Sequence, residues 1–329
     1  MTGSKDDLFQ LGKDVLVSLI ILLIILGSLY AFSGRWPPMV VVESGSMMHG
    51  ENSQIGVIDP ADIVLVQETD RDEITTYVEG RATGYRMYGQ YGDVIIFEPD
   101  GDNSETPIIH RAVIYLEYDE EDSSFDIPSL EDLEYGEDWT TSDAHETARG
   151  LDPSTDVTIY DYGYADLEVT IELSELNDSG YITMGDSHRT NAPEYDQKGA
   201  RGDDPVKEEW IKGRARGELP WFGIIKLAFM GRTEHIPRNS WINFGVTIGI
   251  ILLLPLIIDL GTKIYKKTYK KKKADDIDKE NPNPTSKPNE VEKKCPEKYE
   301  IENREGLDER PDEDKEESRA TMSSDLEDS

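Results

Sequence analysis

The sequence predicts a mainly β domain that is flanked by two transmembrane α-helices and followed by a disordered tail. Two apolar runs without charged residues, 15–34 and 239–258, each have about the 20 residues needed to cross the hydrocarbon core of a bilayer. Between them, apolar residues come in short β-branched runs bounded by turn residues, which is typical of strands. From residue 274 onward the chain has almost no large apolar side chains.

Composition narrows the class of protein. The chain of 329 residues carries 34 Lys and Arg against 68 Asp and Glu, a formal net charge of −34. A surface this acidic repels a phosphate backbone, so nucleic acid is excluded as a partner. Such a surface stays hydrated, as in proteins from salty environments. The single cysteine, Cys295, excludes an internal disulfide framework. No metal or small-molecule cofactor is expected.

The first apolar run is predicted to be a retained membrane anchor. Residues 1–14 form a short N-terminus, and residues 15–34 are the spanning helix. A cleavable signal peptide has a shorter apolar core and ends at a small-residue cleavage site. The second helix is expected at residues 239–260. Trp241 suits the membrane interface at its start, and Pro255 is tolerated near its end.

Lysines after the second run predict the orientation. Residues 261–273 form a basic segment, which is expected on the cytoplasmic side of the cell membrane, where anionic headgroups attract it. Two spans then place both termini in the cytoplasm and residues 35–238 outside it. Residues 274–329 cannot bury a core and are expected to be a disordered acidic tail.

The extracytoplasmic segment is predicted to be mostly β. Turn residues introduce several runs, as at residues 59–62 and 92–93, and only residues 129–134 hint at helical periodicity. Residues 117–156 are acidic with Ser, Thr and Gly, which indicates an inserted surface excursion. The expected strands are 39–43, 63–67, 94–97, 108–115, 156–160, 167–173 and 180–184.

A candidate nucleophile lies in Ser44-Gly45-Ser46, at the end of the β-branched run 40–42 and just outside the first span. Gly45 lets the backbone turn sharply, so that a serine hydroxyl projects from the strand end. A serine hydroxyl is a weak nucleophile unless a base takes its proton and a third group orients that base. Since Ser-Gly-Ser is common in loops, the motif indicates a nucleophile only if the sequence also supplies a candidate base.

Among the five histidines, His110 stands apart because it follows Pro107-Ile108-Ile109 inside an apolar strand. The plainer interpretation is a buried histidine satisfied by a backbone carbonyl. The functional one is a general base that accepts the proton of Ser46. The other four histidines are weaker candidates. His49 is only three residues from Ser46, and His145 is expected in solvent. His188 lies in a polar turn, and His235 is expected at the membrane interface.

The orienting carboxylate is expected near the loop bracketed by Asp186 and Asp196. An aspartate in a loop of an acidic protein is usually solvated or caps a turn. Asp186 is more suggestive because it directly follows a strand and Gly185.

Taken together, these segments resemble type I signal peptidases of the archaeal and endoplasmic-reticulum branch. The resemblance covers residues 36–228. His49 stands where the family usually has a proline, and insertions at about 68–90 and 117–156 separate the matching segments. The matching segments are Ser44-Gly45-Ser46-Met47-Met48 for the nucleophile motif, residues 91–97 and 108–112 for the strands that carry the base, residues 182–186 and 195–197 for the acidic box, and residues 213–223 for the end of the domain.

This resemblance implies a signal-peptidase-like β fold and a role for each reacting group. Ser46 is then the nucleophile, and its backbone N–H and the Ser44 hydroxyl form the oxyanion hole. His110 is the base, at a position where bacterial members have lysine. Asp196 orients the histidine and Asp186 is a supporting carboxylate. Because the loop between them is longer than in the family, the two aspartates remain exchangeable.

The implied activity is the removal of N-terminal signal peptides from exported preproteins by a membrane-bound serine endopeptidase, through an acyl-enzyme. The expected partners are preproteins, the protein export machinery and the lipid bilayer. Substrate is expected to pair along the strand edge and to contact Val41, Val42, Glu43 and Met47. Two alternatives stay open. One is a catalytically inactive, membrane-anchored β scaffold or binding protein, and the other is a related peptidase with a specialised set of precursors.

Overall fold

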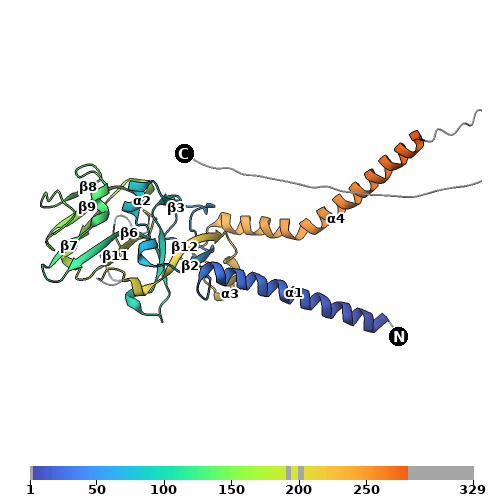
Figure 1. Ribbon diagram of the computed structural model, residues 1–329, viewed down its shortest axis with the longest axis horizontal. Helices are drawn as coiled ribbons and strands as arrows, with labels where there is room; N and C mark the ends of the chain where they lie inside the picture. The colour runs from blue at the N-terminus through green and yellow to red at the C-terminus, as the bar shows by residue number, and fades with distance from the viewer. Residues whose placement is uncertain (1–2, 190–193, 199–203, 281–329) are drawn as a thin grey trace, which may run out of the picture. The chain divides into compact units, whose positions relative to one another are not determined.

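The computed structural model describes residues 3–189, 194–198 and 204–280, and it confirms an antiparallel β domain flanked by two long apolar helices (Figure 1). The chain divides into two units, Met1–Lys263 and Ile264–Ser329, and the described part of the second is the end of the C-terminal helix. Residues 281–329 of the expected acidic tail lie outside the described residues.

The helices are α1 (Gly3–Ser33), α2 (Tyr77–Thr83), α3 (Ile224–Met230) and α4 (Arg238–Glu280). The strands are β1 (Met39–Val41), β2 (Ile63–Gln67), β3 (Arg86–Met87), β4 (Gln90–Tyr91), β5 (Val94–Phe97), β6 (Ile108–Asp119), β7 (Ser124–Asp126), β8 (Trp139–Thr141), β9 (Asp156–Tyr162), β10 (Leu167–Glu172), β11 (Gly180–Met184) and β12 (Ile211–Leu219).

Helices α1 and α4 contain the two apolar runs. Their stretches Phe9–Ser33 and Arg238–Lys272 are long enough to cross a membrane, and the most apolar 18-residue windows within them have mean hydropathies of 2.8 and 2.3, respectively. A signal sequence near the N-terminus passes the same test, so length and composition establish membrane-compatible helices and no more. Helix α4 continues to Glu280, so the basic segment is helical and so are residues 274–280, which were expected to belong to the tail.

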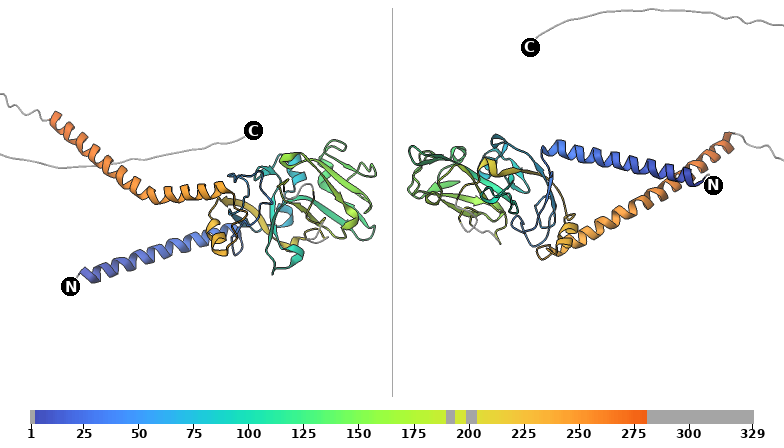
Figure 2. Two further views of the ribbon diagram at one scale, coloured as in Figure 1. Left: turned by 180° about the vertical axis from the view of Figure 1, so that it is seen from behind. Right: turned by 90° about the horizontal axis from the view of Figure 1, so that it is seen from below.

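Both helices are fixed to the segment 53–68, which contains β2. The Glu68 N–H donates to the carbonyl of Ser33 at 2.7 Å, where α1 ends. Near the start of α4, the Asn239 side chain accepts from Ser53 N–H at 3.0 Å and donates to its carbonyl at 2.8 Å. Figure 2 shows α1 and the first part of α4 meeting the same end of the β domain.

The main sheet has the order β1-β2-β12-β5-β6-β11, and every pairing in it is antiparallel. Strands β2, β5 and β11 have the bounds expected from the sequence, whereas β6 continues to Asp119. Strand β12 was not among the expected strands. Its inward positions are the small residues Gly213 and Ala215, so it lacks the apolar alternation that identifies a half-buried strand.

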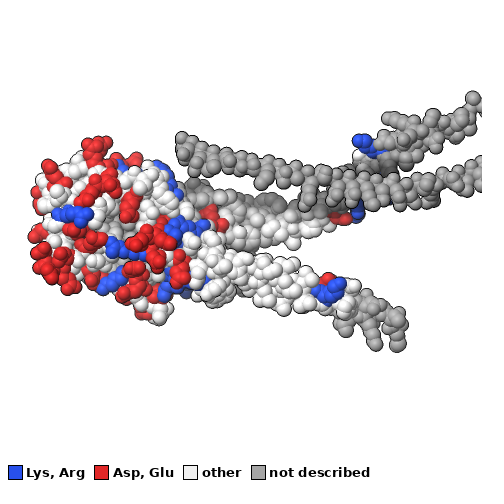
Figure 3. Space-filling model, in the orientation of Figure 1, with Lys and Arg blue, Asp and Glu red and all other residues white. Residues whose placement is uncertain are grey.

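The acidic segment 117–156 contributes to the largest core cluster and is therefore more than a surface excursion. Strand β8 joins β9 and β10 in a second sheet, and Phe125, Leu130, Trp139 and Leu151 are at most 2% exposed. Acidic residues lie between these anchors, on the side of the segment that faces water. Figure 3 shows acidic side chains distributed over the visible face of the domain, while most of α1 carries none. The hint of helix at residues 129–134 corresponds to a short 3₁₀ turn, Pro128–Asp132.

Candidate active site

The serine segment is held by its own neighbours in the sequence. Met47 is 1% exposed and packs in the core cluster beneath β2 and β12, and burial of a side chain of this size stabilises the segment by about 1.5–3 kcal/mol. On either side of Met47 the chain stays near the surface, and Ser44 Oγ lies 3.2 Å from Ser46 Oγ. Gly45 does not adopt a positive φ, so the sharp turn expected there is an ordinary one in which Met48 N–H donates to the Gly45 carbonyl at 3.2 Å.

His110 and Asp196 form a close pair. His110 lies on β6 opposite Ile95 of β5 and is 1% exposed, and its Nδ1 is 2.5 Å from Oδ2 of Asp196. The same carboxylate oxygen accepts from the Thr183 hydroxyl at 2.8 Å, and Asp196 N–H donates to the Thr183 carbonyl at 2.8 Å. Because β11 carries Thr183 beside β6, the sheet brings together two side chains that are 86 positions apart. With Nδ1 donating to the carboxylate, Nε2 is left as the basic nitrogen.

A groove of about 630 Å³ joins the serines to this pair. Ser44, Ser46 and His110 all line it, and its opposite wall is the turn between β5 and β6, including Asp100 and Pro107. The four residues expected to contact substrate line the same groove: Val41, Val42, Glu43 and Met47. The structure therefore places the candidate nucleophile, the candidate base and the expected substrate contacts around one space.

Asp186 belongs to a different ion pair. Its two oxygens accept from Nε and Nη2 of Arg111 at 2.7 and 2.5 Å, and both side chains are almost completely buried. Burial opposes ionisation of Asp186, but the adjacent guanidinium outweighs that cost and keeps the pKa of the carboxyl below its ordinary value. Arg111 also donates to the carbonyls of Tyr91 and Gly92 at 3.0 and 2.9 Å. Asp186 is thus a structural anchor in this geometry, and Asp196 is the carboxylate at the histidine.

His49 completes a second histidine–aspartate pair, which sequence reasoning missed. Its Nε2 lies 3.3 Å from Oδ2 of Asp186, and its ring packs on Tyr164 with centroids 4.7 Å apart. The residue after Asp186 holds the nucleophile segment directly, since Ser187 N–H donates to the Ser46 carbonyl at 2.8 Å. His49 therefore links the segment that carries Ser46 to the buried Arg111–Asp186 pair. In the sequence, the separation of only three positions between His49 and Ser46 is the one feature that points to a role for His49 near the serine segment.

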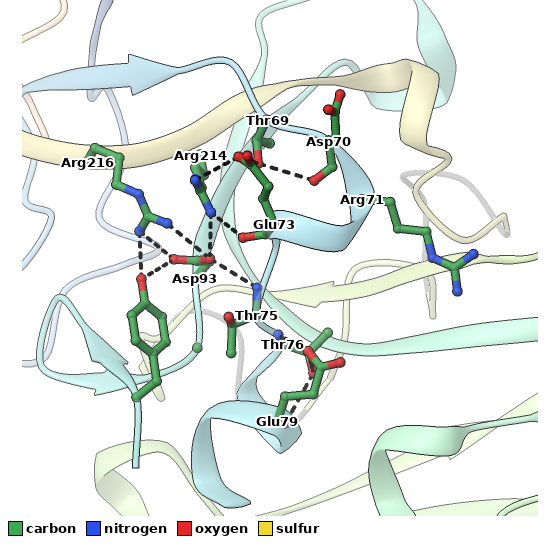
Figure 4. Close-up of polar contacts among 12 residues, drawn as sticks. Thr69, Asp70, Arg71, Glu73, Thr75, Thr76, Glu79, Asp93, Arg214 and Arg216 are labelled. Carbon is green, nitrogen blue, oxygen red and sulfur yellow. Dashed lines mark hydrogen bonds and ion pairs between the residues drawn. The ribbon is translucent and has the colours of Figure 1, made fainter. Parts of the chain in front are cut away.

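The Gly92-Asp93 turn contains a buried carboxylate, Asp93, that does not line the groove. Asp93 is 0% exposed and accepts from Arg216 at 2.7 Å, from the Tyr85 hydroxyl at 2.8 Å and from Thr75 N–H at 3.1 Å. Figure 4 shows Arg214 and Arg216 of β12 pointing toward it. This network ties β12 to the start of β5, so it supports the sheet that carries His110.

A cluster of carboxyls lies under the loop that follows the serine segment. Asp59 and Asp62 are at most 1% exposed, and Asp59 N–H donates to Asp62 Oδ2 at 2.9 Å. Burial raises the pKa of Asp59 to about 6 and that of Asp62 to about 7, and burial also raises the pKa of Glu218. In the sequence, Asp59-Pro60-Ala61-Asp62 has only the pattern of a turn, so it does not indicate that both carboxyls are buried.

The remaining histidines lie outside the groove. His145 hydrogen-bonds to the Thr147 hydroxyl at 2.7 Å, His188 pairs with the Tyr164 hydroxyl, and His235 is exposed before α4. Within the described ranges, no group of three or more His, Cys, Asp or Glu side chains is arranged to hold a metal ion. Comparison with protein-family models and with curated proteins gives no match for this chain.

Proposed function

We propose that this chain is a membrane-bound serine endopeptidase that removes signal peptides from exported preproteins, as its resemblance to type I signal peptidases implies. One observation carries the proposal. Ser46 and His110 line the same groove, and the second ring nitrogen of His110 is paired with Asp196. A hydroxyl, an imidazole and an orienting carboxylate are the three groups of a serine triad for nucleophilic acyl transfer.

The roles follow from the contacts. Asp196 and the Thr183 hydroxyl fix the orientation and tautomer of His110, so that Nε2 accepts the Ser46 proton as the hydroxyl attacks the peptide carbonyl. His110 then returns the proton to the leaving amine, and water hydrolyses the acyl-enzyme. The backbone N–H of Ser46 and the nearby Ser44 hydroxyl are the proposed donors to the oxyanion, where one donor is typically worth about 3–4 kcal/mol.

The acyl part of the substrate is proposed to lie in the groove between the strand edge at Val41–Glu43 and the first residues of β6. Val41, Val42 and Met47 give this part of the groove an apolar lining, which is suited to small apolar side chains near the scissile bond. Extended backbone added along such an edge gains main-chain hydrogen bonds whatever its sequence, which suits an enzyme with many clients.

A bilayer location agrees with three features. Helices α1 and α4 have the length and hydropathy of spans. Helix α3, between β12 and α4, exposes Ile225, Phe229 and Met230 at 49%, 89% and 48%. An apolar surface of this kind is suited to the membrane interface. The proposal places residues 35–238 outside the cytoplasm and both termini inside it, with the lysines of residues 261–273 at the inner leaflet.

The test uses the full chain in membranes and a precursor that bears a signal peptide. Ser46→Ala should abolish cleavage, whereas Ser154→Ala, the same substitution at an exposed turn, should leave it unchanged. Equal cleavage by the parent and Ser46→Ala would sink the proposal. A parent that cleaves no general precursor but cleaves one member of a pilin-like or regulatory panel would indicate the specialised peptidase, and no cleavage at all would favour the scaffold.

A further inference from the structure

A second cavity lies against the serine segment. It has a volume of about 760 Å³ and, like the groove, it is lined by Ser44 and Ser46. Its other walls come from the residues after the serine segment, from Ser187 and Arg189, and from the connection between α3 and α4. Ser46 thus borders two spaces that share no lining residue other than the two serines.

The two spaces match the two halves of an extended substrate. If the proposed function holds, the half that becomes acylated lies in the groove, because the strand edge and His110 are there. Peptide advances about 3.3 Å per residue when extended, so the residues after the scissile bond leave the groove at once and need room beyond Ser46. The second cavity is the space that borders Ser46 there. We name it the leaving-side cavity.

The lining of the leaving-side cavity combines apolar walls with acid groups. Met48, Ile236 and Pro237 form apolar surface, and Ile236 is 9% exposed. Two glutamates, Glu51 and Glu234, also line it. Arg189 compensates the first of these, since its Nη2 is 3.0 Å from Glu51 Oε1. Glu234 has no ion-pair partner among the residues that the structure describes, so its charge is open to an incoming cationic side chain.

The connection that carries Glu234 has a defined shape. Ile236 N–H donates to the Thr233 carbonyl at 3.3 Å, and Arg232 N–H donates to the Leu227 carbonyl at 2.9 Å. Ile236 also packs with Leu227 of α3 in a core cluster. Glu234 is therefore presented from an ordered turn and not from a free end.

We propose that the leaving-side cavity binds the first residues of the mature chain and selects Lys or Arg among them. A long basic side chain can lay its methylene stem on Met48, Ile236 and Pro237 while its cationic head meets Glu234. A glutamate at the same substrate position would bring like charges together. This inference rests on the proposed function, and it adds a specificity determinant on the side of the bond that the groove does not reach.

The experiment uses three precursors that are identical up to the scissile bond and differ only in the second residue after it: Lys, Gln or Glu. The full-length protein in neutral liposomes is assayed for kcat/KM on each. An exposed ion pair contributes weakly, but attraction and repulsion act together in the comparison of Lys with Glu, so the parent should prefer Lys by about three- to tenfold. Molar salt should shrink the preference.

Glu234→Gln keeps the shape of the side chain and removes its charge, so the ratio of Lys to Glu precursors should fall toward one. Glu120→Gln, the same change at an exposed turn outside both spaces, should keep the parent ratio. An unchanged ratio in Glu234→Gln, or a parent ratio near one, would overturn the inference. So would a loss of discrimination at substrate positions before the bond, tested with a second set of precursors. Failure of the parent to cleave the Gln precursor would instead refute the proposed function.

Discussion

Replacement of Asp59 by Asn should make the protein more stable at alkaline pH. Asp59 is 1% exposed, its Oδ2 accepts from Gln54 N–H at 2.5 Å, and its buried Oδ1 has no hydrogen-bond partner among the described residues. An asparagine can keep the bond to Gln54 through its amide oxygen and place the NH₂ group where Oδ1 was. The charge is lost while the shape is retained.

The size and sign follow from the pKa of Asp59, which burial raises from 3.8 to about 6. In the native state this carboxyl holds its proton at pH values where the unfolded chain has released it. Its contribution to stability is therefore complete below pH 4 and is lost as pH rises through 4 to 6. The full loss corresponds to about 3 kcal/mol. Asp59→Asn should remove this cost at pH 8 and change little at pH 4.

Thermal melting of the full chain in detergent micelles, followed by tryptophan fluorescence, measures the effect. For a domain of this size 1 kcal/mol corresponds to about 2–4 °C, so the variant should melt about 6–12 °C above the parent at pH 8. Asp122→Asn, in the exposed turn between β6 and β7, is the matched control and should follow the parent at both pH values. A variant that melts with the parent at pH 8, or a parent whose stability does not fall between pH 4 and 6, would refute the reasoning.

Two further predictions concern the histidine–aspartate pairs. Asp196→Asn should lower kcat by roughly 10²–10⁴-fold because it disorients His110. The variant should melt within a few degrees of the parent, since no buried cation is left unpaired. A decrease in kcat of less than tenfold on the same precursor would show that Asp196 takes no part in the reaction. Arg111→Met should cost about 3–5 kcal/mol in the free energy of unfolding, since Asp186 would be left as a buried and uncompensated charge. Arg111→Met with Asp186→Leu should recover part of that loss, and a double variant no more stable than the single one would contradict the ion-pair explanation.

Much of the fold could be predicted from periodicity alone. Strands β2, β5 and β11 are β-branched runs between turn residues, and their bounds agree with expectation because nothing in the tertiary structure competes with that pattern. The two long helices were equally clear because an uncharged run of about 20 residues has few other structures available to it.

The missed elements share a physical cause. Helix α2 has only seven residues, and its stability comes from a capping box between Thr76 and Glu79 and from Gly84 in the left-handed region at its end. Such a helix depends on its caps and on burial of Tyr77 and Val78, and a short sequence window contains too few turns to show periodicity. Strand β12 could not be predicted from apolar alternation, because its buried positions are occupied by Gly213 and Ala215 and not by large apolar residues.

The candidate site shows where sequence reasoning reaches its limit. Residue types and order, together with the family resemblance, named Ser46, His110 and two aspartates as candidates, but they left the roles of Asp186 and Asp196 exchangeable. The structure gives each aspartate a different histidine. Asp196 is paired with a histidine that lines the groove, whereas Asp186 is paired with both a buried arginine and His49.

That difference decides which pair is suited to chemistry. A carboxylate that is already paired with a guanidinium has less charge to offer a second cationic partner, so Asp186 is the weaker support for a histidine. Asp196 accepts only from the Thr183 hydroxyl and the imidazole in the described contacts, and under the proposed function its charge is the one that would stabilise a protonated His110. Arg111, next to His110 in the sequence, thus separates the two aspartates: it neutralises Asp186, whose neighbour Ser187 holds the backbone of Ser46, and leaves Asp196 free for the role in proton transfer that the proposed function gives it.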